Sequence, residues 1–179
     1  MNNSKDNLAL LEERAIADMN IAAGWVAPGH STEDVVLKLR MGRQAGLKDQ
    51  VALQHIYIVT NKKEGTKSIG FDGQAMLALI KSSPAYGGSE YRWLDKSGKW
   101  HKVEEDPIPD RMEFAGWATK MWRADAQDIY MATFTLADAK KLGLSEKWAW
   151  QRWFVELCKW RTVADCGRTV FADLLAGLG

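Results

Sequence analysis

Two strand-like runs in the middle of the chain most strongly limit how it can fold. The runs RMEFAGWATKMWR (111–123) and DIYMATFT (128–135) are rich in aromatic and β-branched residues, and only the short segment ADAQ separates them. Two such runs joined by a few polar residues are typical of an antiparallel hairpin. We therefore predict a long hairpin over residues 111–135 and, with it, a mostly antiparallel sheet.

Further strand signals lie on the N-terminal side of this hairpin. EYRWLD (90–95) and GKWHKVEE (98–105) flank a Lys-Ser-Gly turn. HIYIVTN (55–61) can pair back with SIGF (68–71) across a lysine-rich turn. Both patterns indicate short antiparallel pairs, because β-branched and aromatic runs are bounded by turn residues.

Helical segments alternate with these strands. The predicted helices cover residues 5–20, from Ser31 or Thr32 to about Leu47, 73–83, 136–143, and a final region from Ser145 onward. The side chains expected to cap the last three are Asp72, Thr135 with Asp138, and Ser145. This order of elements predicts an α+β fold with helices packed against antiparallel sheet. The length predicts one domain over residues 1–179.

The charge balance and cysteine content limit the partners and the compartment. The net charge is +1, so any site for a polyanion must come from local clustering of basic residues. No apolar run is long enough to span a membrane, and the N-terminus carries no apolar signal segment. Cys158 and Cys166 are expected to be small core residues rather than a disulfide, which favours a cytoplasmic location.

The sequence offers no pattern for catalysis. It contains no G-x-x-x-x-G-K-[ST] segment for an ATP-driven recombinase and no G-x-S-x-G segment or Cys/His pairing for a nucleophile. The acidic residues of one Pro-broken loop could serve as metal ligands of a nuclease, but an exposed acidic loop is the simpler interpretation; they are Glu104, Glu105, Asp106 and Asp110. We expect a protein that is not an enzyme, with no cofactor and no dedicated Mg²⁺ site.

The stretch WAWQRWFVELCKWRTVADCGRTVF (148–171) is the strongest candidate for a binding function. It contains four of the nine tryptophans together with Arg152, Lys159, Arg161 and Arg168. A helical wheel places one apolar stripe in the core, comprising Trp153, Leu157, Trp160, Ala164 and Phe171. Arg161 and Arg168 are seven residues apart and fall on another face. That face is either solvated charge or a row of guanidinium groups that tracks the phosphates of a nucleic acid.

Other basic residues carry the same two interpretations. The hairpin tip NKKEGTK (61–67) contains three lysines, which either keep the tip soluble or reach a phosphate backbone. Lys120 and Arg123 flank the end of the later hairpin.

Several short motifs, in order, resemble one family. Gly46-Leu47, Ile56-Tyr57, Lys62 and Gly70-Phe71-Asp72-Gly73 match a family segment of the type Gly-Leu … Ile-Tyr … Lys … Gly-apolar-Asp-Gly. WRADAQDIYMATF keeps Arg123 and Asp125 of a family hairpin. The family also carries Trp, an apolar residue, a basic residue, Arg and an aromatic residue at spacings that match Trp150, Leu157, Arg161, Arg168 and Phe171. The chain thus resembles the RecT/Red beta family of phage single-strand DNA annealing proteins.

This resemblance implies a fold, a function and a set of partners. The fold would be the α+β core of Rad52, RecT and Red beta annealing proteins, used for both DNA binding and oligomerisation. The function would be ATP-independent annealing of complementary single strands in homologous recombination and DNA repair, in the cytoplasm of a bacterial or phage-infected cell. The expected partners are single-stranded DNA, the nascent annealed duplex, further copies of the chain in a ring or helical filament, and a phage exonuclease or host single-strand-binding protein. No membrane partner is expected.

The resemblance also assigns residues and leaves one alternative open. It implies that Lys62, Trp150, Arg161 and Arg168 line the nucleic-acid groove, with Arg123 retained beside it. Where family members often carry a lysine this chain has Val155, so Arg152 or Lys159 is expected to supply that phosphate contact. The family's C-terminal helical region has no counterpart before the chain stops at Gly179. The alternative function is a protective single-strand DNA-binding protein without annealing activity.

Overall fold

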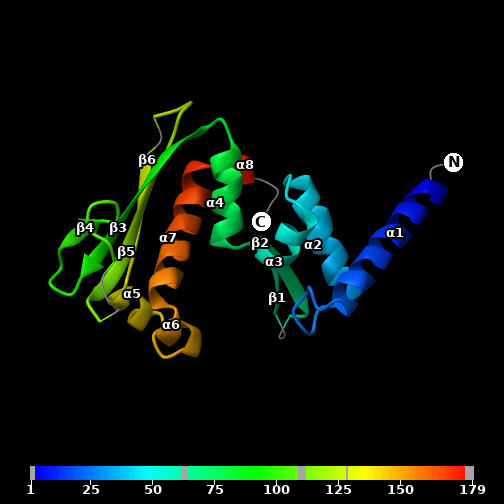
Figure 1. Ribbon diagram of the computed structural model, residues 1–179, viewed down its shortest axis with the longest axis horizontal. Coiled ribbons are helices and arrows are strands. Elements are labelled where there is room, and N and C mark those ends of the chain that lie inside the picture. Colours follow the sequence, from blue (N-terminus) through cyan, green and yellow to red (C-terminus); the bar gives the residue numbers. More distant parts are fainter. Residues whose placement is uncertain (1–2, 62–63, 109–111, 128, 176–179) are drawn as a thin grey trace. The chain divides into compact units, whose positions relative to one another are not determined.

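The computed structural model describes residues 3–61, 64–108, 112–127 and 129–175. The described chain forms two compact units, one up to Ala75 and one from Met76 onward (Figure 1). Both contain helices and antiparallel strands, which confirms the predicted α+β class. None of the helices in the described part of the chain is long and apolar enough to cross a membrane.

The N-terminal unit combines helices with a two-stranded hairpin. Its elements are α1 (Asn3–Ala22), α2 (Thr32–Gln44), α3 (Asp49–His55), β1 (Ile56–Asn61) and β2 (Thr66–Phe71). Ile56 pairs with Phe71 and Asn61 with Thr66, so the predicted antiparallel pairing of these two segments is confirmed. Ser31, one of the two caps that the sequence offers, caps α2, and it forms a reciprocal capping box with Asp34.

The C-terminal unit contains a four-stranded antiparallel sheet. Helix α4 (Gly73–Ser82) leads into the strands β3 (Tyr86–Asp95), β4 (Trp100–Lys102), β5 (Phe114–Arg123) and β6 (Ile129–Thr135). Their order in the sheet is β4-β3-β5-β6. The predicted long hairpin is confirmed, because β5 and β6 pair in register from Gly116 with Thr135 to Trp122 with Ile129.

Helices follow the hairpin to the end of the described chain. They are α5 (Leu136–Lys141), α6 (Trp148–Arg152), α7 (Phe154–Val170) and α8 (Ala172–Leu175). The capping box of Thr135 and Asp138 is present at α5, and the Asp72 carboxylate caps α4 by accepting the N–H groups of Gln74 and Ala75. The predicted Ser145 cap is wrong: α6 begins after Lys147, which makes no side-chain capping bond.

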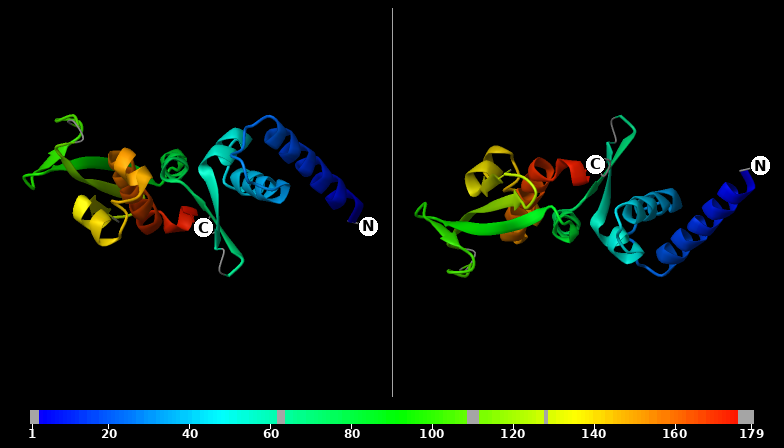
Figure 2. Two further views of the ribbon diagram at one scale, coloured as in Figure 1. Left: turned by 90° about the horizontal axis from the view of Figure 1, so that it is seen from below. Right: turned by 90° about the horizontal axis from the view of Figure 1, so that it is seen from above.

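Helix α7 lies along one face of the sheet, against β5 and β6 (Figures 1 and 2). Its buried side repeats at nearly every fourth residue, through Phe154, Cys158, Thr162, Cys166 and Val170. These mostly small side chains let the helix approach the sheet closely. Both cysteines are free thiols with no exposed surface, which confirms their predicted core role.

The predicted apolar stripe of this region is wrong in part. The helix is interrupted at Trp153, whose backbone (φ −122°, ψ 36°) separates α6 from α7 and leaves its indole 48% exposed. Leu157, Trp160 and Ala164 are only half-buried, while Phe171 is in the core as predicted. The helical wheel assumed one continuous helix, but α6 ends at Trp153 and α7 begins after it. The wheel also selected large apolar side chains, whereas mostly small ones face the sheet.

Helix α7 also packs closely against α4. A Cβ atom at Gly167 would lie 2.9 Å from both the Ile80 Cδ1 and the Met76 Sδ atoms. Met76 and Ile80 share a buried cluster with Val163 and Cys166 of α7. Glycine at this position therefore sets how near the two helices lie.

Candidate nucleic-acid interface

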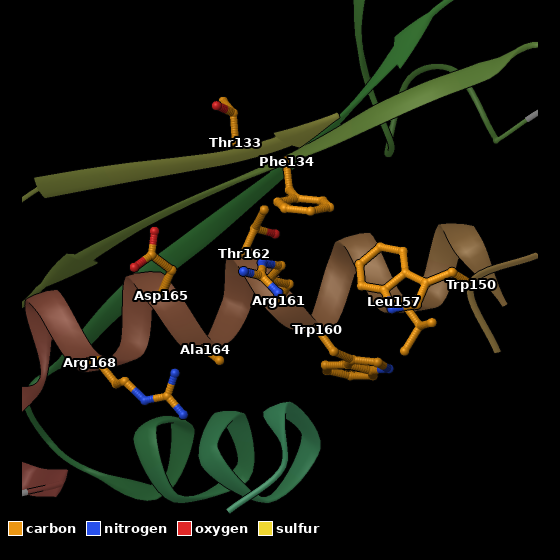
Figure 3. A pocket seen from close by; sticks show the side chains of 10 residues that line it. All are labelled: Thr133, Phe134, Trp150, Leu157, Trp160, Arg161, Thr162, Ala164, Asp165 and Arg168. Atoms are coloured by element: carbon orange, nitrogen blue, oxygen red, sulfur yellow. The ribbon is translucent and has the colours of Figure 1, made fainter. Parts of the chain in front are cut away.

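An open hollow of about 520 Å³ lies between α7 and the strand β6, and Figure 3 shows its lining. The side chains around it come from β6, α6 and α7; they are Thr133, Phe134, Trp150, Leu157, Trp160, Arg161, Thr162, Ala164, Asp165 and Arg168. We call this site the α7 hollow. It contains three of the residues that the sequence assigns to a nucleic-acid groove, namely Trp150, Arg161 and Arg168.

Helical periodicity brings the α7 side chains to this one hollow. Leu157, Arg161, Ala164 and Arg168 follow each other at intervals of four, three and four residues. Residues at these intervals lie on the same side of an α-helix. The two guanidinium groups therefore extend from one side of α7, as Figure 3 shows.

Aromatic rings form part of the wall. The rings of Phe134 and Trp150 lie with their centroids 5.4 Å apart, and Trp150 also contacts Phe154 at 6.1 Å. The guanidinium carbon of Arg161 lies 4.6 Å from the centroid of the Phe134 ring. This cation–π contact orients Arg161 without neutralising its charge.

The charge of the lining is positive on balance. Arg161 and Arg168 are exposed and face a single carboxylate, that of Asp165. Among the described residues, neither arginine forms an ion pair within 4.0 Å. The Tyr130 hydroxyl instead donates to Asp165 at 3.5 Å, and the negative charge of Asp165 raises the pKa of that phenol. Two exposed guanidinium groups without carboxylate partners can each bind an oxyanion through paired N–H donors.

Arg123, also assigned to the groove, lies in a different environment. Its guanidinium donates to Asp125 at 2.7 and 2.8 Å and to Asp173 at 2.6 Å, with a longer bond to the Val170 carbonyl at 3.3 Å. The side chain is only 11% exposed, and its charge lies 5.6 Å from the Phe171 ring centroid. Hydrogen bonds to Asp125 and then Asp173 raise its pKa. Arg123 thus joins the end of β5 to the end of α7 and to α8.

The remaining assigned basic residues are not in the lining. Arg152 lies beside the indoles of Trp148 and Trp153, on α6 and at its end. The Lys159 ammonium lies 4.7 Å from the Trp160 ring and 5.8 Å from those of Tyr91 and Trp117. Lys62 falls outside the described residues.

The acidic loop is engaged with basic neighbours. Glu105 pairs with Lys102 at 2.8 Å, and Asp106 lies 2.7 Å from His101, whose other ring nitrogen contacts Asp95. Asp110 lies outside the described residues. Within the described ranges, no group of three or more His, Cys, Asp or Glu side chains is arranged to hold a metal ion.

The sequence did not identify the strand side of the hollow. Thr133 and Phe134 belong to the hairpin, about twenty residues before the start of α7. Leu157, Trp160 and Ala164 were assigned to the core, but they line the hollow beside the arginines. The intervals between Leu157, Arg161 and Arg168 are the signal that could have placed them together.

No protein-family model and no curated protein matches this chain.

Proposed function

We propose that this protein is an ATP-independent single-strand DNA annealing protein of homologous recombination, and that the α7 hollow holds the DNA backbone. One observation carries the proposal: Trp150, Arg161 and Arg168 surround one open hollow, and the two arginines have no carboxylate partner among the described residues. The motif resemblance that selected these three residues rests on sequence spacing alone. That spacing also puts both arginines on one side of α7, so the support that the fold adds is the position of Trp150, on α6, in the same lining.

The spacing of the arginines suits an extended polyanion. Seven residues of α-helix span about 10 Å, close to three nucleotides along one strand of B-form DNA. Guanidinium groups bind phosphate oxygens through two N–H donors, and the indole of Trp150 can pack against a sugar or base. Such contacts hold a strand without reading its sequence, because phosphates are the same at every position.

Annealing follows if the base edges face outward. The backbone of the first strand would occupy the hollow, and Watson–Crick pairing with a second strand would supply the sequence discrimination. Copies of the chain arranged side by side in a ring or filament would join their hollows into one groove, and the basic lining would screen the repulsion between two polyanions. An exonuclease or a single-strand-binding protein of the host remains a proposed partner on the resemblance alone.

The double variant Arg161→Ala/Arg168→Ala tests the backbone site. We expect weaker binding to single strands of every sequence, and a log–log salt dependence flatter by about 0.7 for each lost phosphate contact. The matched control is Arg14→Ala, which removes an exposed arginine that pairs with Glu33 in the N-terminal unit. Binding with an unchanged salt dependence in the double variant would move the DNA site away from the hollow.

A protective single-strand-binding protein is the second candidate, because two arginines that hold the phosphates of one strand would serve protection as well as annealing. Mixing two complementary oligonucleotides, one labelled with a donor and one with an acceptor dye, separates the two functions. An annealing protein accelerates the appearance of energy transfer, and Arg161→Ala/Arg168→Ala loses that acceleration. A protective protein slows pairing relative to DNA alone.

A further inference from the structure

A second aromatic and basic cluster lies on α6, outside the hollow. The guanidinium carbon of Arg152 is 5.5 Å from the ring centroids of both Trp148 and Trp153. The two indoles are 67% and 48% exposed, respectively. We call these three residues the indole platform. A cation held beside two exposed indoles presents flat aromatic faces and a positive charge at the same place.

Basic side chains accompany the two indoles of the platform. Lys147 directly precedes Trp148 and is also exposed, so two basic side chains accompany the two indoles. The acidic side chains nearest in sequence are Glu146 and Glu156, so these four charges balance, and any affinity of the platform must come mainly from its rings. Stacking on tryptophan with nearby Lys or Arg is how proteins bind unpaired nucleobases irrespective of their identity, since every base has a π-face.

The platform and the α7 hollow are both built on helix α6. Trp150, which lines the hollow, lies two residues after Trp148. Two residues turn an α-helix by about 200°, so Trp148 and Trp150 leave α6 on nearly opposite sides. A helix with its side chains is about 10 Å wide, so a strand in the hollow reaches the platform within a few nucleotides.

We propose that Trp148, Arg152 and Trp153 stack unpaired bases of the nucleic acid whose backbone the α7 hollow holds. This inference rests on the proposed function, and it adds a base-dependent contact to a backbone-dependent one. Bases inside a duplex are already stacked on each other, so the platform binds single strands and not the annealed product. It therefore gives the protein a preference for unpaired DNA that the phosphate contacts alone do not supply.

The experiment compares an oligothymidine with an abasic oligonucleotide of the same length and backbone charge. Wild-type protein is expected to bind the oligothymidine more tightly, by fluorescence anisotropy of labelled DNA. The variant Trp148→Ala/Trp153→Ala should lose about tenfold in affinity for the oligothymidine and nothing for the abasic strand. Trp148→Phe/Trp153→Phe keeps two aromatic faces and should retain most of the difference between the two DNAs.

The control is Trp25→Ala, which removes another half-exposed indole, 50% accessible, from the N-terminal unit. Equal losses on both DNAs, or none on either, in Trp148→Ala/Trp153→Ala would overturn the platform. A change in sedimentation without a change in base dependence would overturn it as well, because the indoles would then pack against a second copy of the chain. Failure of the backbone site has a different signature: Arg161→Ala/Arg168→Ala would bind both DNAs like the wild type.

Discussion

Two arginines of the C-terminal unit, Arg123 and Arg161, have similar aromatic neighbours but differ in whether carboxylates pair with them. Arg123 and Arg161 each place a guanidinium group near a phenylalanine ring, 5.6 Å from Phe171 and 4.6 Å from Phe134. Arg123 also has two carboxylates within 2.7 Å, whereas Arg161 has no ion-pair partner among the described residues. Arg123 therefore links parts of the fold through its carboxylate partners. The Arg161 guanidinium, which has no such partner among the described residues, keeps its N–H donors for a ligand.

The largest effect is expected from giving the hollow the carboxylate that the Arg123 site has. Ala164 is half-buried, lines the hollow, and lies three residues after Arg161 and four before Arg168 on α7. Ala164→Glu places a negative charge within one helical turn of each arginine and should weaken single-strand binding about tenfold at low salt, through repulsion of phosphates and pairing with a guanidinium. Filter binding at several salt concentrations measures this, and the loss should shrink as screening increases.

Ala164→Gln is the matched control, because glutamine has nearly the size of glutamate and no charge. It should bind within about twofold of the wild type if charge is the cause. A tenfold loss in Ala164→Gln would mean that the space at Ala164 matters and that the electrostatic contrast between the two arginine sites is secondary.

A smaller effect, now on stability, is expected at Arg123. Arg123→Ala removes hydrogen bonds that link β5 to Asp173 and to the Val170 carbonyl, and should lower the midpoint of thermal unfolding by about 5 °C. Arg161→Ala/Arg168→Ala should lower that midpoint by no more than about 2 °C, because the two arginines form no ion pair with the described residues and Arg161 only contacts the Phe134 ring. Circular dichroism of the three proteins checks both expectations, and an equal drop in the double variant would erase the contrast.

The Arg123 contribution should also depend on pH. Hydrogen bonds from Arg123 lower the pKa values of Asp125 and Asp173 in the folded protein. Carboxylates with lowered pKa values stabilise the fold fully above their ordinary pKa, near 4, and lose that contribution as the pH falls through the folded value. The difference in midpoint between wild type and Arg123→Ala should therefore be constant from about pH 7 to 5 and shrink below about pH 4. A difference that stays constant down to pH 2 would assign it to packing on Phe171.

The smallest effect is expected for the reactivity of the two cysteine thiols, which lie on the side of α7 that packs against the sheet. Burial raises the pKa of the Cys158 thiol to about 12 and that of Cys166 to about 11, so almost no thiolate is present at pH 8. A disulfide reagent should react with neither thiol in the native protein and with both after unfolding. Ala164→Cys, in the hollow, should react within minutes; slow reaction there would mean that the hollow is closed.

Features determined by neighbouring residues could be predicted from the sequence. The caps at Ser31, Thr135 and Asp72 need partners only two or three residues away; the sequence predicts the last two, and Ser31 as one of two alternatives. Helix α3 was missed because it has seven residues and its N-cap, Lys48, makes no capping bond. The face of α7 that packs on the sheet was also missed, because the break at Trp153 changes the helical phase and small side chains give a weak apolar signal.

The difference between Arg123 and Arg161 could not be predicted for a related reason. Both belong to motifs of the same family resemblance, and both lie near aromatic residues in the sequence. Asp125 is two residues from Arg123, but Asp173 is fifty residues away and meets it only in the folded chain. Whether a basic residue is neutralised within the fold depends on such long-range contacts.

Gly167 affects the width of the α7 hollow although it is not one of the lining residues. The missing side chain lets Met76 and Ile80 of α4 press against α7 from the side away from β6. A larger residue there would move the whole helix, and with it every guanidinium group it carries, relative to Thr133 and Phe134 on the strand. The distance between the arginines of α7 and the strand β6 therefore depends on a residue that does not line the hollow. Two proteins with identical lining residues but a different residue at this position would differ in that distance.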